Sequence, residues 1–280
     1  MRDSTSNLVS TDWLQNHLDD SNVVILDTTL KKRPDGTQIN QEPVYIRGAQ
    51  EFNYDTDVCD PDTDLPHMLP SPEQFTKAAR ERGISKDTLV VCYDALNVFC
   101  APRGWWMFKI MGHDNVVVLD GGLPKWLAEN RPTQDAFSKP KREGSFEANF
   151  RANMVRDVDQ VQAAVDVAES QTIDARSAGR FNATEPEPRP GMRGGHIPGS
   201  SCLPFTELLE GGCFKSRSQL KSILENTIRP GIEQIVFSCG SGVTASILAL
   251  AADECGYSNF AVYDGSWAEW AGREDLPAAS

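Results

Sequence analysis

Cys239 is the residue of this chain whose surroundings best suit nucleophilic chemistry. It lies in IVFSCGSGVTASILALAA (residues 235–252), where an apolar run ends at the cysteine, glycines and small hydroxyl residues follow, and an apolar helical pattern then begins. This pattern predicts a strand, a tight loop and a helix that begins near Gly242. Gly240 and Gly242 allow backbone N–H groups to turn inward, and the helix N-terminus adds its positive dipole end. The loop therefore favours a thiolate, a persulfide or an anionic substrate, and the alternative is a buried structural cysteine before a tight turn.

Four arginines crowd into one segment that precedes the cysteine loop in the chain, DARSAGRFNATEPEPRPGMRGG (residues 174–195). A planar guanidinium suits two-point recognition of a carboxylate, so this cluster predicts a site for a small anion in a protein that is otherwise acidic. Arg176 directly follows a predicted strand, and we expect it to order the loop by pairing with a carboxylate. The alternative for each of these arginines is a solvated surface charge.

The stretch DTDVCDPDTDLPHMLP (residues 55–70) is acidic, polar and interrupted by proline. Its composition alone predicts a surface loop, with a weak cation site as the alternative. The spacing of its aspartates does not match an EF-hand, which also needs a glycine and a terminal glutamate.

The composition narrows the class of protein. The chain has 280 residues, of which 40% are hydrophobic and 24% charged, as in ordinary globular proteins. The net charge of −13 argues against nucleic acid or an anionic membrane as a main partner. The seven cysteines are odd in number and form no CxxC pair, so neither a disulfide framework nor a zinc site is predicted. We expect no bound metal.

The sequence also carries a prediction about location. No run of the chain approaches the ~18 apolar residues of a membrane span. The start, MRDSTSNLVSTDWL, lacks the apolar core of a signal peptide. We therefore expect a cytoplasmic, monomeric protein that does not bind membranes, with mitochondrial import as the alternative.

The elements that must position these residues occur twice along the chain. In the first half we predict a strand at 23–27, an irregular segment ending at 45–52, a helix at 71–83, a strand at 89–94, a helix at 101–112 and a strand, turn and helix over 115–126. Their counterparts in the second half are 171–176, 194–205, 216–226, 233–239, 242–256 and 259–270. Short apolar strands that alternate with helices predict a parallel sheet covered on both faces.

The spacing of matching residues indicates a duplication. Asp27 corresponds to Asp174, 147 positions later, and Asp120 corresponds to Asp264, 144 positions later. A period this long is typical of duplicated domains rather than of a solenoid.

Two α/β domains and a linker follow from this period. We predict a first domain at 1–135, a linker rich in polar residues and proline at 136–153, and a second domain at 154–280. The position that matches Cys239 in the first half is Asp94, and its segment lacks the glycines. Only the second half therefore keeps a nucleophile.

The motifs VLDGGLPKW, APRGWW, DARSAGRFNA, GHIPGS, CGSGVTA and YDGSWAEW span nearly the whole chain. They resemble those of the two-domain rhodaneses, and most closely those of the 3-mercaptopyruvate sulfurtransferases. The resemblance implies tandem rhodanese-like α/β domains, each a parallel sheet flanked by helices on both faces, with the active site in the second domain facing the first. It also implies an enzyme without a metal or an organic cofactor.

The resemblance implies a role for each residue of the candidate site. Cys239 would be the nucleophile that carries sulfur as a persulfide, and Arg180 and Arg189 would bind 3-mercaptopyruvate. A thiol acceptor, such as thioredoxin or a small dithiol, or cyanide in an assay, would then take the sulfur. The loop residues that would complete the substrate site are Gly240, Gly242, Val243 and Thr244.

A proton relay is also implied. His67 would exchange a proton with Ser241, and Asp57 would orient His67. Because this chain has two extra residues after YIRGA, Asp55 is the alternative to Asp57.

Three other functions are less consistent with these residues. Thiosulfate-preferring relatives carry cationic residues where this chain has Gly240 and Ser241, so the neutral loop argues against a thiosulfate sulfurtransferase. Cysteine phosphatases of a related fold place an arginine six residues after the nucleophile, where this chain has Ala245. A non-enzymatic rhodanese module for binding or sulfur sensing would be favoured by a missing or disrupted cysteine loop, and this loop is intact.

Overall fold

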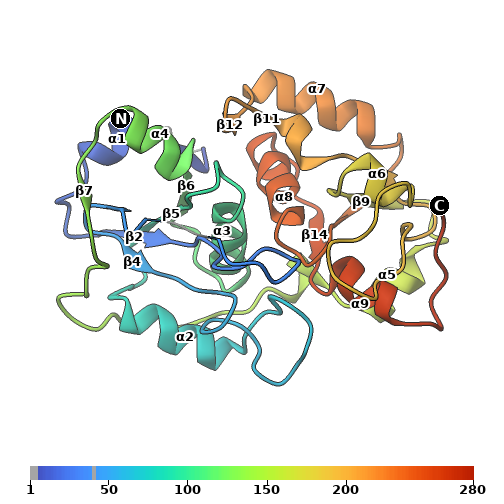
Figure 1. The fold of residues 1–280 in the computed structure, drawn as a ribbon, viewed down its shortest axis with the longest axis horizontal. Helices are drawn as coiled ribbons and strands as arrows, with labels where there is room; N and C mark the ends of the chain where they lie inside the picture. The colour runs from blue at the N-terminus through green and yellow to red at the C-terminus, as the bar shows by residue number, and fades with distance from the viewer. Residues whose placement is uncertain (1–5, 40–41) are drawn as a thin grey trace.

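Two five-stranded sheets, one in each half of the chain, form the framework of the structure (Figure 1). The computed structural model describes residues 6–39 and 42–280, so the predicted start of the first domain lies outside the described residues. The strand order is β1-β6-β5-β2-β4 in the first sheet and β10-β9-β13-β14-β8 in the second. When the second order is reversed, it reads β8-β14-β13-β9-β10. Each strand then stands at the same position as its counterpart in the first sheet. The predicted α/β fold is confirmed.

All neighbouring strands within the two sheets run parallel. The strands of the first sheet are β1 (Leu8–Val9), β2 (Val23–Asp27), β4 (Gln50–Glu51), β5 (Leu89–Tyr93) and β6 (Val116–Leu119). Those of the second are β8 (Val155–Arg156), β9 (Ser170–Asp174), β10 (Ser201–Cys202), β13 (Gln234–Ser238) and β14 (Phe260–Tyr263). Two antiparallel pairs lie outside the sheets, namely β3 (Tyr45–Ile46) with β7 (Thr133–Gln134) and β11 (Leu209–Glu210) with β12 (Cys213–Phe214).

Helices cover both faces of each sheet because side chains of the central strands alternate between two apolar layers. In β5, Val90 belongs to the layer under α2 (Pro72–Glu81) and α3 (Ala101–Ile110), and Val91 belongs to the layer under α1 (Thr11–Gln15) and α4 (Gly122–Ala128). The second sheet repeats this arrangement, with α7 (Arg217–Thr227) and α8 (Ala245–Glu254) on one face and α5 (Val158–Ala164) and α9 (Ser266–Gly272) on the other. The remaining elements are α6 (Ala178–Phe181) and the 3₁₀ turns η1 (Ala152–Met154) and η2 (Phe205–Leu208).

Local hydrogen bonds set the helix starts. Ser71 and Gln74 form a capping box at α2, with Pro72 in the first turn, and Ser216 and Gln219 form another at α7. The predicted start of α8 near Gly242 is wrong, because Gly242 has a left-handed backbone (φ 76°) and the helix begins three residues later.

The two halves pack against each other through α3 and α8, which face one another at the centre of the molecule (Figure 1). One apolar cluster runs through both, from Trp105 in the first half to Leu248 in the second.

Two carboxylates related by the repeat bridge this boundary. The Leu69 N–H donates to Asp264 Oδ2 over 2.9 Å, and the Phe214 N–H donates to Asp120 Oδ1 over 2.8 Å. We call these two contacts the interdomain carboxylate bridges.

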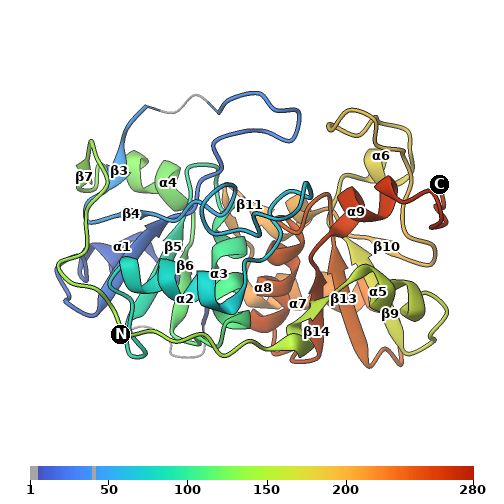
Figure 2. The same cartoon turned by 90° about the horizontal axis from the view of Figure 1, so that it is seen from below.

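The segment between the halves is bound to the first domain along its length (Figure 2). The Gly144 N–H donates to the Arg80 carbonyl, the Phe146 N–H to the Ile84 carbonyl and the Arg151 N–H to the Ile110 carbonyl. These bonds fix the segment against the first domain, where it runs past α2 and α3.

Candidate active site

The cysteine loop, residues 239–244, is held by backbone hydrogen bonds at the C-terminal end of β13. Ser266 Oγ accepts the N–H groups of Cys239, over 3.2 Å, and Gly242, over 3.1 Å. The carbonyls of Cys239 and Gly240 accept N–H groups from the first turn of α9. The N–H groups of Ser241, Val243 and Thr244 have no hydrogen-bond acceptor among the described residues, so they can bind an anion.

Ser266 is a functional residue that the sequence analysis missed. Its backbone is left-handed (φ 52°), and its counterpart in the repeat is Gly122, which has φ 54°. A serine that replaces a glycine in this conformation is strained, and here its hydroxyl gains the contacts that hold the cysteine loop. The comparison of DGGLPKW with DGSWAEW was the signal that could have found it.

Cys239 lies at a cavity of about 200 Å³ between the two domains. The cysteine is 1% exposed. One wall is apolar, and Phe99 of the first domain meets Phe205 of the second there, edge to face, with ring centroids 5.5 Å apart. The other residues that line the cavity are Leu30, Pro34, His67, Ala175, Arg176, Ser177, Arg180, Arg189, Gly240, Ser241, Val243 and Thr244.

Arg180 and Arg189 converge on this cavity beside Gly240. A Cβ atom at Gly240 would lie 3.1 Å from Arg180 Nη2 and 3.7 Å from Arg189 Nη1, so the missing side chain lets both guanidinium groups approach the loop. Arg189 Nη2 donates to Ser241 Oγ over 3.3 Å. Burial lowers the pKa of the Arg189 guanidinium, whereas the nearby Cys239 acts in the opposite direction. The side of the cavity formed by the two arginines is therefore cationic and partly dehydrated, as an anion site requires.

Arg176 has the ordering role that the sequence predicted. It is buried and pairs with Asp174 and with Glu187, at 2.7 Å in each case, and its guanidinium lies 4.5 Å from the centroid of the Trp267 ring. Glu187 also accepts from Arg180. This shared carboxylate fixes the direction of Arg180 towards the cavity.

His67 reaches across from the first domain to the cysteine loop. Its Nδ1 lies 3.0 Å from Ser241 Oγ, and its Nε2 lies 3.2 Å from Asp55 Oδ1. The expected contact from Asp57 is corrected, because His67 is paired with Asp55. Asp57 is exposed, and its carboxylate accepts from the neighbouring Thr56 hydroxyl.

A turn at Asn53 explains this choice of carboxylate. The Asp55 N–H donates to Asn53 Oδ1, and the N–H groups of Asp57 and Val58 donate to the Asn53 carbonyl. The turn directs Asp55 inward and buries Val58, which leaves Asp57 in solvent. The hydrogen bond with His67 lowers the pKa of Asp55.

Arg103 is a second residue that the sequence analysis passed over. It is fully buried in α3 of the first domain. Its Nη2 donates to the His67 carbonyl and to Asp264 Oδ1, and its Nη1 approaches the Gly242 carbonyl at 3.5 Å. The signal in the sequence was one arginine within the otherwise apolar APRGWWMF.

Thr244 lies at the N-cap position of α8 but makes no side-chain capping bond, and it lines the cavity together with Val243. This place at the cavity is the one that the resemblance implied for Thr244.

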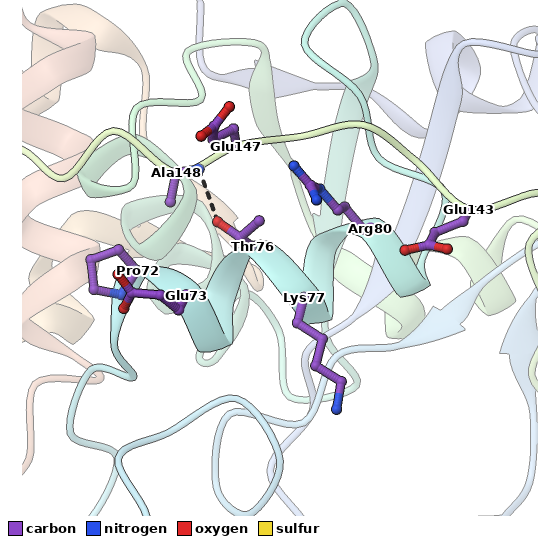
Figure 3. Close-up of a pocket in the computed structure, with 8 residues that line it drawn as sticks. All are labelled: Pro72, Glu73, Thr76, Lys77, Arg80, Glu143, Glu147 and Ala148. Carbon is purple, nitrogen blue, oxygen red and sulfur yellow. Dashed lines mark hydrogen bonds between the residues drawn. The ribbon is translucent and has the colours of Figure 1, made fainter.

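A second hollow, of about 400 Å³, lies between α2 and the segment that joins the domains (Figure 3). The lining side chains carry both signs of charge, among them Lys77, Arg80 and Glu147, and include no thiol or imidazole. Nothing in it resembles a reaction centre, so the cavity at Cys239 is the candidate active site.

No helix within residues 6–39 and 42–280 is long and apolar enough to cross a membrane. No group of three or more His, Cys, Asp and Glu side chains there could hold a metal ion.

Together, the duplicated parallel sheets and the single cysteine on a glycine loop facing an arginine wall define a cysteine-dependent transferase of the rhodanese type. The Rhodanese-like domain matches residues 10–129 and again residues 157–273. The chain belongs to the rhodanese family. Within this family it belongs to the two-domain enzymes called 3-mercaptopyruvate sulfurtransferases. The resemblance inferred from the motifs is thereby confirmed.

Three comparisons define this relationship. The 3-mercaptopyruvate sulfurtransferase of Escherichia coli K12 is 40% identical over 278 residues, which is 98% of each chain. The thiosulfate/3-mercaptopyruvate sulfurtransferase 2 of Arabidopsis thaliana is 39% identical over 293 residues, covering 96% of this chain and 85% of the relative. The crystal structure of SseA from Escherichia coli, a 3-mercaptopyruvate sulfotransferase, superposes with a TM-score of 0.83 at 36% identity and covers 94% of this chain and 99% of that one.

Proposed function

We propose that this enzyme takes sulfur from 3-mercaptopyruvate, holds it as a persulfide on Cys239 and passes it to a thiol, releasing pyruvate. The observation that carries the proposal is the cavity itself, in which Arg180 and Arg189 face Cys239 across Gly240. Two guanidinium groups suit the carboxylate and ketone oxygens of a small 2-keto acid.

In the first half-reaction the Cys239 thiolate attacks the sulfur of the substrate. The S–S bond forms as the C–S bond breaks, and the electron pair passes into the enolate of pyruvate, which the two arginines stabilise. Ser241 donates a proton to the enolate carbon and regains one from His67, which Asp55 orients. The 3.0 Å contact between His67 and Ser241 supports this relay.

In the second half-reaction a thiolate acceptor attacks the outer sulfur of the persulfide. The S–S bond breaks, the acceptor leaves with the sulfur, and the Cys239 thiolate is restored. The N–H groups of the cysteine loop favour the anionic persulfide between the two steps. Two separate half-reactions predict ping-pong kinetics.

Thioredoxin or a small dithiol is the acceptor that we propose. The domain boundaries (1–135, 136–153 and 154–280), the monomeric state and the cytoplasmic location stay predictions.

Thiosulfate is the second candidate donor, since the Arabidopsis relative carries both substrates in its name. The uncharged Gly240 and Ser241 disfavour it, because thiosulfate is a dianion whose sulfonate has no matching cation at these loop positions. A non-enzymatic binding module is disfavoured by the intact cysteine loop.

The test compares both donors with purified enzyme. Pyruvate is followed from 3-mercaptopyruvate with a dithiol, and thiocyanate from thiosulfate with cyanide. We expect a strong preference for 3-mercaptopyruvate. After reaction with this donor, the mass of the wild-type protein should increase by one sulfur atom, and the mass of Cys239→Ser should not. A preference for thiosulfate would contradict the substrate assignment, and sulfur retained by Cys239→Ser would contradict the nucleophile.

A further inference from the structure

The two interdomain carboxylate bridges differ in one respect. Asp264 and Asp120 each accept one backbone N–H from the opposite domain, from Leu69 and Phe214 respectively. Only Asp264 also receives a charged side chain, because Arg103 donates to its Oδ1 over 2.7 Å. The bridge at Asp264 lies beside the cysteine loop, whereas the bridge at Asp120 lies beside the loop of Asp94, where a carboxylate stands in place of the nucleophilic thiol.

The repeat shows that the structure can join the domains without this arginine. Arg103 is the third residue of α3, and the third residue of α8 is Ile247, a buried apolar side chain. A buried ion pair carries a large desolvation cost, and apolar side chains of similar volume often stabilise an interface as well. Stability alone therefore does not require Arg103.

The contacts of Arg103 instead converge on the relay. One guanidinium binds the carbonyl of His67 in the first domain and approaches the carbonyl of Gly242 in the second. Both residues have left-handed backbones, with φ 63° at His67 and φ 76° at Gly242. A left-handed backbone is uncommon for a residue that has a side chain, so the contacts around His67 must support it. The guanidinium carbon of Arg103 also lies over the Trp106 ring, 4.6 Å from the ring centroid, and this contact helps to hold the side chain in place.

We propose that Arg103 is a positioning residue that fixes His67 against the cysteine loop across the domain boundary and so maintains its hydrogen bond with Ser241. This inference rests on the proposed relay. Arg103 is not among the residues that line the cavity, so it acts on the site through its contacts with His67 and Gly242.

The test measures pyruvate formation by Arg103→Met, His67→Asn and the double variant. Displacement of a catalytic group by about 1 Å can slow a reaction by roughly 10²-fold, and we expect kcat of Arg103→Met to fall by about that factor. The double variant should be no slower than His67→Asn within about twofold, because no relay is left to position. Arg103→Lys should recover part of the rate, since it keeps the charge but loses the planar fork.

Asp120→Asn is the matched control. It alters the corresponding bridge, on Phe214, without touching the cysteine loop, and we expect its kcat to stay within about twofold of the wild type even if its thermal unfolding temperature falls. If Arg103→Met does not fold, Arg103→Lys and Asp264→Asn carry the same comparison with His67→Asn. Each variant is first checked for cooperative unfolding.

The outcomes separate this inference from the proposed function. A multiplicative loss in the double variant, or an equal loss in Asp120→Asn, would mean that Arg103 only joins the domains, and the inference would be overturned. Wild-type kcat in Arg103→Met beside a slow His67→Asn would overturn it while leaving the relay intact. Full activity in His67→Asn would overturn the relay and the inference together, while the donor comparison would still test the sulfur transfer.

Discussion

At the scale of single residues, Asp55 and Asp57 show how a local turn selects one of two similar side chains. They are two positions apart, and both precede His67 in the same loop segment. The hydrogen bonds at Asn53 direct Asp55 towards the imidazole and leave Asp57 in solvent. This preference depends on the path of the backbone, which residue types alone do not determine.

We therefore expect Asp55→Asn to lower kcat by about 10-fold to 10²-fold, because the variant no longer orients His67 with a charge. A positioned acid or base contributes ~10²–10⁴-fold to a rate, and the loss of its orienting carboxylate removes part of that factor. Asp57→Asn is the control and should leave kcat unchanged. Steady-state pyruvate formation measures both variants. The reverse pattern would restore Asp57 as the relay carboxylate.

Because residue types alone do not determine the path of the backbone, the sequence could predict only some of the site residues. Cys239, Arg180 and Arg189 belong to distinctive motifs, and the structure brings them to one cavity. Ser266 and Arg103 were missed because each acts through backbone groups that are distant in the sequence. Such contacts arise only when α9 and α3 have packed against the cysteine loop.

At the scale of elements, apolar periodicity predicted the central strands of both sheets and the longer helices. The strand predicted at 23–27 is β2 with the same bounds, and the helix predicted at 71–83 is α2, which ends two residues earlier. The start of α8 was misplaced because apolar periodicity does not report the left-handed backbone of Gly242.

The segment between the domains is fixed at its end by an ion pair whose contribution depends on pH. Arg151 donates two hydrogen bonds to Asp114 and, with Lys109 nearby, lowers the pKa of Asp114 to about 2. Because this value lies below the ordinary pKa of about 3.9, the pair stabilises the folded state fully above pH ~4 and loses this contribution as the pH falls towards 2.

We expect Asp114→Asn to lower the free energy of unfolding by less than about 1 kcal/mol at neutral pH, since the Asp114 side chain is largely exposed. The difference from the wild type should shrink between pH 4 and pH 2. Urea unfolding at pH 6 and at about pH 3 measures it. Asp166→Asn, at an exposed aspartate without an ion pair to another described residue, is the control, and a difference that grows on acidification would contradict the assignment.

At the scale of the whole molecule, the duplication was readable from matching residues such as Asp120 and Asp264, but the interface between the two copies was not. The two domains share a fold, yet only the second has a cysteine at the position predicted for the nucleophile. In the first domain, Asp94 occupies the place of the nucleophile, and its buried carboxylate accepts the N–H groups of Leu96, Cys100 and Ala101. The carboxylate thus fills the position that an anion would take.

A thiol at that position should therefore remain inactive. We expect Asp94→Cys, made in the Cys239→Ser background, to form no pyruvate and to be less stable by about 1–3 kcal/mol for each N–H left unpaired. Pyruvate assays and urea unfolding measure the two effects. Restored turnover would show that the first domain keeps a working pocket, and Asp94→Asn, which retains an acceptor oxygen, provides the comparison for stability.

The interdomain carboxylate bridges also place two backbone amide protons, those of Leu69 and Phe214, in the boundary between the halves. Each proton is bonded to a carboxylate of the opposite domain, so this bond is lost when the halves part, even while both sheets stay folded. Deuterium uptake at these two amides therefore reports separation of the domains apart from unfolding. Since His67 and Cys239 lie on opposite halves, the same exchange rate gives the fraction of time for which the active site is taken apart.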